Sequence, residues 1–137
     1  MIKIASDSSR LIIIGNHVVR DQLAATSDPA RKAHLLAVYD ALPKRDVPTE
    51  GALWGISKWG ESTWGDGGHT GISLTDAKTG GRGGHHDALI ATTAAGHADV
   101  LVTNDSDLAK KIEPSQAVCL VWSFDDFLHF LSAKGPD

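Results

Sequence analysis

The sequence has one cysteine, no long apolar run and no block of basic residues, and each absence removes a class of protein. A lone Cys119 cannot form a disulfide framework, and its apolar neighbours indicate a buried structural thiol in a reducing compartment. The apolar runs are far shorter than the roughly 20 residues of a membrane span, and no secretory signal pattern opens the chain. We therefore expect a cytoplasmic protein with no membrane association.

The formal net charge of -4 argues against broad, nonspecific binding to nucleic acid. It does not exclude a nuclease, because a metal-loaded acidic pocket can act on phosphodiesters with few basic residues around it. The 137 residues, of which 42% are hydrophobic, are enough for one domain with its own core. We therefore treat residues 1–137 as a single domain.

Strand-like and helix-like patterns alternate along the chain. The predicted elements are a strand at 11–14, a helix at 17–23, a helix capped by Ser27 or Asp28 and ending before Pro43, a helix beginning near Asp87, a strand at 100–102, a short helix near Ser106, a strand at 117–122 and a last helix opened by a capping box at Ser123. This order predicts an α/β fold, a three-layer αβα arrangement around a mostly parallel central sheet.

A glycine- and tryptophan-rich insertion is expected at about 44–84. Residues 51–84 hold eleven of the 14 glycines, and Trp54, Trp59 and Trp64 recur every five residues, each followed by glycine. A period of five matches neither helix nor strand, so we interpret the segment as a long irregular loop. The tryptophans could stack on unpaired RNA bases. We favour the alternative, that they fold the loop against the core.

The stretch HHDALIATTAAGHADVLVTNDSDL, residues 85–108, carries the strongest chemical signal. Asp87 opens a helix, and Asp105 and Asp107 follow an apolar strand. Reactive groups in open parallel sheets gather beyond the carboxyl ends of the strands, where these carboxylates could meet. Clustered carboxylates need a cation, and all-oxygen ligation suits Mg²⁺ or Mn²⁺. Helix capping is the simpler alternative for each acid.

Other residues near these acids are weaker candidates. Asp21 projects from the first helix, where solvated acids are common. Possible substrate contacts are Thr103, Asn104, Ser106 and Arg82, for which turn formation or solvent exposure explains the sequence nearly as well. His85 and His86 invite a zinc interpretation, but adjacent helical residues point about 100° apart, so we prefer a solvated pair.

These features resemble the PIN-domain ribonucleases, some of which are toxins of toxin–antitoxin pairs. Residues 85–108 match the family's helix beginning with Asp and its strand ending in an acidic cluster, and LIIIGNHVVRDQLAATSDPARKAHLLAVYDALP, residues 11–43, is similar to its second acid-bearing element. The closing VCLVWSFDDFLHFL also fits. The resemblance implies that Asp21, Asp87, Asp105 and Asp107 hold Mg²⁺ or Mn²⁺, with Asp87, Asp105 and Asp21 catalytic, and that the metal activates water against an RNA phosphate.

The amino terminus departs from the family pattern. PIN domains open with a central strand that ends in Asp, whereas MIKIASDSSR is similar to the end of the helix that should follow it, and Asp7 lies in a predicted turn. A missing central strand would remove a metal ligand and expose strand edges, so self-association into a homo-oligomer is expected.

Two functional hypotheses follow. The first is a metal-dependent endoribonuclease, with RNA as substrate and an antitoxin protein as a possible partner. The second is a catalytically inactive PIN-like module that binds a protein or RNA partner, motivated by the absent first-strand Asp. A haloacid-dehalogenase relative would need a D-x-D-x-[TV] loop on its first strand, and the sequence has none there.

Overall fold

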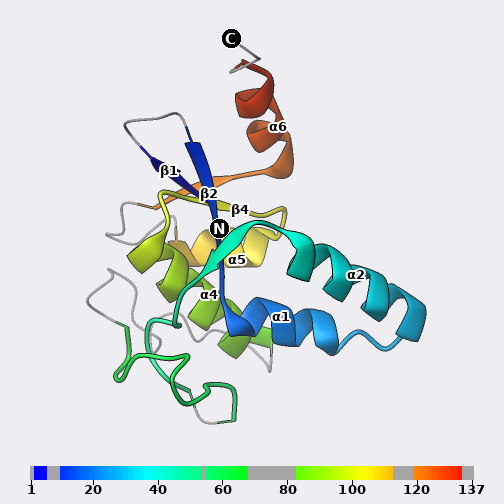
Figure 1. Cartoon of the computed structure of the whole chain (residues 1–137). Coiled ribbons are helices and arrows are strands. Elements are labelled where there is room, and N and C mark those ends of the chain that lie inside the picture. The colour runs from blue at the N-terminus through cyan, green and yellow to red at the C-terminus, as the bar shows by residue number, and fades with distance from the viewer. Residues whose placement is uncertain (1, 6–9, 54, 68–82, 113–118, 134–137) are drawn as a thin grey trace.

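A computed structural model describes residues 2–5, 10–53, 55–67, 83–112 and 119–133. Within these ranges the chain is a mixed α/β fold (Figure 1). The strands are β1 (Ile2–Ala5), β2 (Arg10–Gly15), β3 (Lys44–Asp46), β4 (Val100–Val102) and β5 (Leu120–Trp122). The helices are α1 (His17–Ala24), α2 (Pro29–Ala41), α4 (Gly83–His97), α5 (Ser106–Ile112) and α6 (Phe124–Ala133).

The five strands form one sheet in the order β3-β2-β1-β4-β5. Strands β2 and β3 are parallel, as are β4 and β5, whereas β1 is antiparallel to both of its neighbours, β2 and β4. Four strands therefore run in one direction and β1 alone runs in the other. The sheet is therefore mixed, with two parallel and two antiparallel pairings.

The amino-terminal prediction is wrong in one respect. Residues 2–5 are not the end of a helix but the central strand β1, in which Ile2 pairs with both Ile13 and Val100. The interior edges that were expected to be exposed are therefore covered. The outer strands of the described sheet are β3 and β5, each three residues long. Such short edges offer little template for pairing with another chain.

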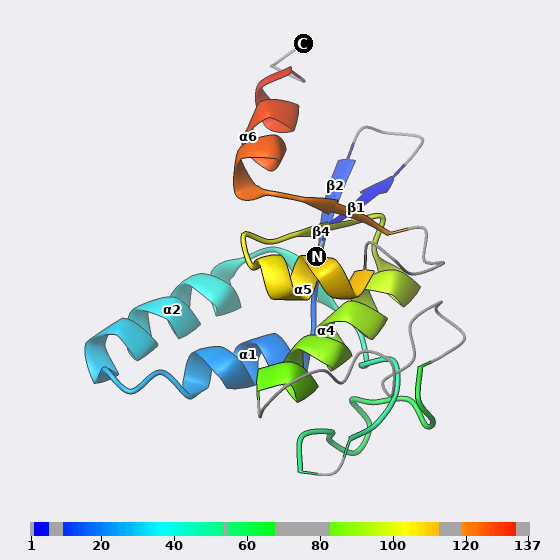
Figure 2. The same ribbon diagram turned by 180° about the vertical axis from the view of Figure 1, so that it is seen from behind.

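Helix α4 is the centre of the hydrophobic core and packs against α1 and α5 (Figures 1 and 2). Its buried face is built largely from alanine, with Leu89 completely inaccessible to solvent. Small side chains let neighbouring elements approach closely, so Val18 of α1 and Leu101 of β4 join the same cluster. The core therefore lies on the face of the sheet that α4 and α5 cover.

Helix α6 does not complete a buried third layer. It contacts β5 and extends away from the other helices (Figures 1 and 2). None of its residues is buried, and Phe124, Leu128 and Leu131 are 40–50% exposed. The mixed α/β class is thus confirmed, whereas the PIN-like three-layer arrangement is not. No helix among the described residues is long and apolar enough to cross a membrane.

The helix starts follow local capping rules. Asn16 accepts a hydrogen bond from the backbone of Val19 at α1, and Asp28 accepts from two amides at the start of α2. At α6, Ser123 and Asp126 form the expected reciprocal capping box, with Ser123 N donating to Asp126 at 2.9 Å and Asp126 N donating to Ser123 at 3.1 Å.

The segment after β3 is attached to α4 by a buried polar network centred on Glu50. The Glu50 backbone amide donates to Thr93 at 3.2 Å, and its carbonyl accepts from Thr92 at 2.8 Å. The Glu50 carboxylate lies 2.7 Å from His97 and accepts from Thr63 at 3.2 Å. These bonds satisfy polar groups that burial would otherwise penalise. They fix the loop beside α1 and α4.

Candidate functional site

Asp21 lies on α1 and is held by two cationic or proton-donating partners. His17 Nδ1 lies 3.0 Å from one Asp21 carboxylate oxygen, and Lys58 Nζ lies 2.9 Å from the other. Burial raises the pKa of Asp21, whereas the hydrogen bonds from His17 and Lys58 lower it. The lowering effects together outweigh burial, so the pKa of Asp21 lies below its ordinary value. Asp21 is therefore an ionised, fully engaged carboxylate.

Asp105 acts as a helix cap. One of its carboxylate oxygens accepts from the backbone amides of Asp107 at 2.9 Å and Leu108 at 3.3 Å, at the start of α5. Both Asp105 and Asp107 are exposed. The Asp107 carboxylate forms an exposed ion pair with Lys110, with 4.0 Å between the ammonium nitrogen and the carboxylate oxygen. The capping alternative thus describes the observed geometry of Asp105.

The candidate substrate contacts beside Asp105 also have structural partners. Thr103 accepts from the Asp105 amide at 3.0 Å, and Asn104 accepts from the Phe124 amide at 2.9 Å, which ties β4 to α6. Ser106 is exposed in the first turn of α5. Arg82 lies outside the described residues.

The structure does not bring the predicted metal ligands together. Asp87 lies half-buried in α4, and among the described residues no group of three or more His, Cys, Asp or Glu side chains could hold a metal ion. The strand direction gives a reason. Strand β1 lies between β2 and β4 and runs antiparallel to both, so its carboxyl end lies at the edge of the sheet opposite to theirs. The carboxyl ends of β2 and β4, which precede Asp21 and Asp105, are therefore two strand spacings, about 10 Å, apart.

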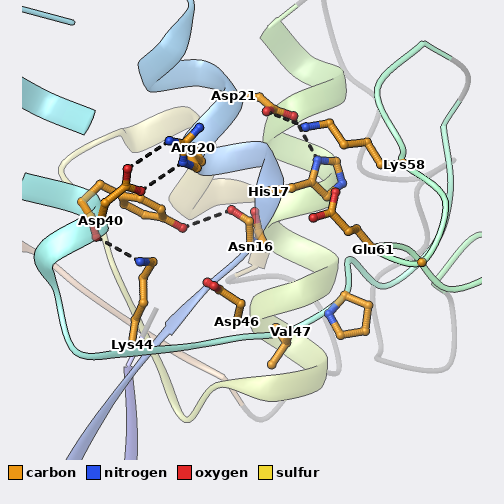
Figure 3. Close-up of a pocket in the computed structure, with 13 residues that line it drawn as sticks. Asn16, His17, Arg20, Asp21, Asp40, Lys44, Asp46, Val47, Lys58 and Glu61 are labelled. Atoms are coloured by element: carbon orange, nitrogen blue, oxygen red, sulfur yellow. Dashed lines mark hydrogen bonds and ion pairs between the residues drawn. The ribbon is translucent and has the colours of Figure 1, made fainter. Parts of the chain in front are cut away.

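A different polar pocket, of about 450 Å³, opens at the carboxyl ends of β2 and β3 (Figure 3). Its walls come from the end of β2, α1, α2, β3 and the loop that follows β3. Its lining residues include Asn16, His17, Arg20, Asp21, Tyr39, Asp40, Lys44, Asp46, Lys58 and Glu61. Only Asp21 among these is a residue that the sequence singled out as a functional side chain.

One wall of this pocket is built by α1 and the loop. Because a carboxylate only accepts, His17 donates from Nδ1 to Asp21, which leaves the lone pair on Nε2 in the neutral ring. The His17 side chain is 5% exposed, and within the described part of the chain Nε2 has no hydrogen-bond partner. Figure 3 shows Lys58 and Glu61 reaching this wall from the loop.

The opposite wall joins α1 to α2 and β3. Arg20 makes a two-bond pair with Asp40, both bonds at 3.0 Å, which raises the pKa of Arg20 and lowers that of Asp40. Lys44 donates to the Tyr39 carbonyl at 3.0 Å, and its ammonium lies 4.4 Å from the centre of the Tyr39 ring. These cations are already partnered within the wall.

The floor of the pocket is formed where β2 ends. Asn16 is 2% exposed, and its side-chain amide nitrogen has no hydrogen-bond partner among the described residues. Tyr39 donates from its hydroxyl to the Asn16 carbonyl at 3.1 Å, and burial raises the pKa of that phenol. Unpaired buried polar atoms are rare in folded proteins, and each requires an explanation such as an ordered water or local strain.

The tryptophan prediction is wrong for the two residues that the structure describes. Trp59 is 88% exposed and Trp64 is 80% exposed, so neither packs on the core. Their rings meet edge to face, 5.5 Å between centroids. The glycine after each has a positive φ, 76° at Gly60 and 100° at Gly65, which turns the backbone sharply and leaves the indoles on the surface. Trp54 lies outside the described residues.

Comparisons with known proteins do not place the chain in a family: no family model matches it, and neither curated proteins nor solved structures gave a match.

Sequence reasoning missed most of the pocket. Its clearest available signal was the pair Gly15-Asn16 directly after an apolar strand, the position at which open α/β sheets place ligands. Asp46 had no such signal, because Lys44–Asp46 is too polar and too short to predict as a strand.

Proposed function

We propose that this chain is a binding domain for single-stranded RNA, which corresponds to the second hypothesis of the sequence analysis. The observation that carries the proposal is the exposed pair Trp59 and Trp64, which lies beside the polar pocket. Trp59 is flanked in sequence by Lys58 and Gly60, both of which line that pocket. An aromatic platform next to a polar cavity suits a ligand with flat faces and hydrogen-bonding edges, as unpaired bases have.

The exposed indoles are the main contribution to binding in this proposal. Each indole leaves most of its apolar surface in water, and large exposed aromatic groups on a folded domain mark interaction sites. Stacking of a base on an aromatic side chain contributes about 1–3 kcal/mol. Two tryptophans would therefore contribute about 2–6 kcal/mol, and the polar groups of the adjacent pocket are expected to supply the rest of the binding free energy.

The charges around the pocket favour a single strand over a duplex. Its lining holds three Lys or Arg side chains against four Asp or Glu side chains, and Arg20 and Lys58 are engaged by Asp40 and Asp21. A duplex is bound mainly through its phosphates, which this lining repels. Binding through bases avoids that cost, and we expect only a weak dependence of affinity on salt.

Fluorescence anisotropy with a short labelled single-stranded RNA tests the proposal. The double variant Trp59→Ala/Trp64→Ala is expected to bind at least about thirtyfold more weakly than wild type, because two stacks of at least about 1 kcal/mol each are lost. Phe124→Ala is the matched control, because Phe124 is an exposed aromatic residue on α6, away from the pocket. Equal affinity of the double variant and wild type, or tighter binding of duplex RNA, would contradict the proposal.

Metal-dependent cleavage of RNA is a second candidate, favoured by one observation. The strands that precede Asp21 and Asp105, β2 and β4, run in the same direction and end at the same edge of the sheet. The same RNA incubated with Mg²⁺ or Mn²⁺ distinguishes the candidates. Cleavage that EDTA stops and Asp87→Asn abolishes would establish the nuclease function. If the RNA stays intact, RNA binding without cleavage is the supported function. A protein partner that resembles an antitoxin is expected only if the chain is a nuclease.

A further inference from the structure

We propose that a second copy of this chain covers the exposed faces of α2 and α6, with α2 of one copy packing antiparallel against α6 of the other. A two-fold axis repeats this contact, so that both helices of each copy are covered in the dimer. The inference goes beyond RNA binding, because these helix faces are separate from the tryptophan surface. It is carried by two apolar stripes that match in spacing and lie among opposite charges.

Large exposed apolar side chains gather in few places on the described part of the chain. Apart from Trp59 and Trp64, they lie on α2, β5 and α6, and they are Val38, Leu42, Leu120, Phe124, Leu128 and Leu131. Helix α2 packs on α1, and α6 contacts β5, so each helix keeps an outer face at the periphery of the molecule (Figures 1 and 2). Exposed apolar surface that gathers in this way marks sites of protein association.

The outer face of α6 is a continuous apolar stripe. Its members are Phe124, Leu128 and Leu131, which are 50%, 44% and 40% exposed. Because successive helical residues are about 100° apart, these three positions fall within about 60° of one another. The stripe is separate from the inner side of the helix, where Phe130 packs against Trp122. Helix α6 therefore has a second apolar side that its own chain leaves in water.

Helix α2 has a stripe of the same width. Its members are Leu35, Val38 and Leu42, and Leu42 is the residue that caps the end of the helix. Val38 is 49% exposed, Leu42 is 39% exposed and Leu35 is half-buried. These positions also fall within about 60° of one another. The residues of this stripe do not line the polar pocket, so covering them leaves the pocket open.

The two stripes match when the helices run antiparallel. Along α6 the apolar residues are separated by four and then three positions, and along α2, read from its end towards its start, the separations are again four and then three. The register pairs Leu42 with Phe124, Val38 with Leu128 and Leu35 with Leu131. Apolar residues at alternating steps of three and four are the spacing with which paired helices interlock their side chains.

The charges beside the stripes are complementary. Helix α6 carries Asp125 and Asp126 and neither lysine nor arginine. Helix α2 carries the exposed Arg31 near its start, and its one acid, Asp40, is already engaged in an ion pair. The antiparallel register brings the acids of α6 to the end of α2, which the exposed Arg45 follows. It brings Arg31 to the carboxyl end of α6, where the helix dipole favours a cation.

Sedimentation velocity over a range of concentrations, up to the high micromolar range, tests the proposal. Wild type is expected to sediment with twice the mass of one chain. Val38→Asp and Leu128→Asp are each expected to be monomeric, because each places a charge in the middle of one stripe. The control is Trp59→Ala/Trp64→Ala, which removes the other large exposed apolar surface and should stay dimeric. A monomeric wild type at every concentration overturns the proposal.

Mixing the two aspartate variants tests which helices pair. Val38→Asp keeps α6 intact and Leu128→Asp keeps α2 intact, so an equimolar mixture should form a heterodimer through one contact, weaker than the wild-type dimer. Pairing of α6 with α6 would leave Val38→Asp dimeric on its own, and pairing of α2 with α2 would leave Leu128→Asp dimeric. Either result overturns the proposed arrangement, as does a mixture that stays monomeric.

Thermal unfolding of each aspartate variant, compared with wild type, establishes that it is folded. Val38→Ala and Leu128→Ala are the milder variants at the same positions, and they remove apolar contact without adding a charge. Each is expected to weaken dimerisation by about tenfold. Dimerisation that both alanine variants leave unchanged overturns the proposal even if an aspartate variant fails to fold.

Discussion

Cys119 shows how burial controls a reactive group in this fold. The side chain is 6% exposed, and burial raises the pKa of the thiol to about 11. The sequence-based expectation of a buried thiol is therefore confirmed. Because the thiolate is the nucleophile, the native protein should be inert to thiol reagents.

At about pH 8 only about one thiol in a thousand would be ionised, given that pKa. We expect Cys119 to react with a chromogenic disulfide reagent far more slowly in the native protein than in guanidinium chloride. The rate of colour development checks this. Complete labelling of native protein at the rate of the unfolded chain would show that the thiol is accessible.

Asp21 links the pocket to stability in acid. Its pKa is lowered in the folded state, so its contribution to stability is complete above the ordinary value of 3.8 and is lost as the pH falls through the folded value. In Asp21→Asn this contribution is absent at every pH. The difference in unfolding free energy between wild type and variant should therefore be largest near neutral pH and shrink below about pH 4.

Urea unfolding of wild type and Asp21→Asn at neutral pH and near pH 3 measures this difference. We expect at most about 1 kcal/mol at neutral pH, because the Asp21 side chain is 35% exposed and water screens its pair with Lys58. A difference that stays constant across the range would mean that Asp21 contributes through packing rather than through charge.

At the scale of elements, the position of the loop after β3 depends on its hydrogen bonds to α4. The Glu50 carboxylate bridges His97 of α4 and Thr63 of the loop, and its side chain is 11% exposed. Removing it takes a partner from the His97 ring, which is 24% exposed, and one of several partners from Thr63, so we expect a cost of about 1–3 kcal/mol at most. Glu50→Ala should therefore release the loop locally before the sheet unfolds.

Hydrogen–deuterium exchange checks this prediction. In Glu50→Ala, amides of residues 49–63 should exchange faster, whereas those in the centre of α4 should be less affected. Glu61→Ala, at an exposed position in the same loop, serves as the control and should leave exchange unchanged. Uniform acceleration across the whole chain would indicate a global rather than a local effect.

The elements that sequence could predict are those with local signals. The starts of α1, α2 and α6 follow from short-range caps such as Asp28 and the box of Ser123 and Asp126. Strands β1 and β3 could not be found in this way. Ile2–Ala5 and Lys44–Asp46 are too short to show a period, and they are strands because β2 supplies their pairing partner.

The site was harder to predict than the helices for a related reason. Chain order brought Asp21, Asp87 and Asp105 into one hypothesis, but distances depend on which strands are neighbours and on their directions. Strand β1 lies between β2 and β4, the strands that precede Asp21 and Asp105, and separates them. Because β1 is antiparallel to both, its first residue and not its last lies at the sheet edge where β2 and β4 end. The pocket instead uses the directly adjacent ends of β2 and β3.

At the scale of the whole molecule, the sheet depends on β1. This strand joins the pair β2 and β3 to the pair β4 and β5, and Lys3 pairs with Ile12 at its middle. Proline there removes a backbone donor and fixes φ, which costs about 3 kcal/mol or more in a helix interior, and we expect a similar cost in a central strand, where proline is essentially not found. Because domains are commonly stable by about 5–15 kcal/mol, Lys3→Pro should lose a large part of that stability.

Thermal unfolding of Lys3→Pro against Lys3→Ala checks the role of β1. The alanine variant keeps the backbone donor and should unfold close to wild type. The proline variant should unfold many degrees lower or fail to fold. Equal midpoints for the two variants would contradict a central position for residues 2–5.

The central claim is that the surface formed by Trp59 and Trp64 beside the pocket binds single-stranded RNA. The most direct measurement is a two-dimensional ¹⁵N–¹H spectrum of the indole N–H groups during titration with oligoribonucleotide, each signal being assigned with a single tryptophan variant. We expect the signals of Trp59 and Trp64 to move and that of Trp122, whose ring packs at a tilt against Phe130, to stay. Saturating RNA that moves neither Trp59 nor Trp64, or that moves Trp122 alone, would contradict the account.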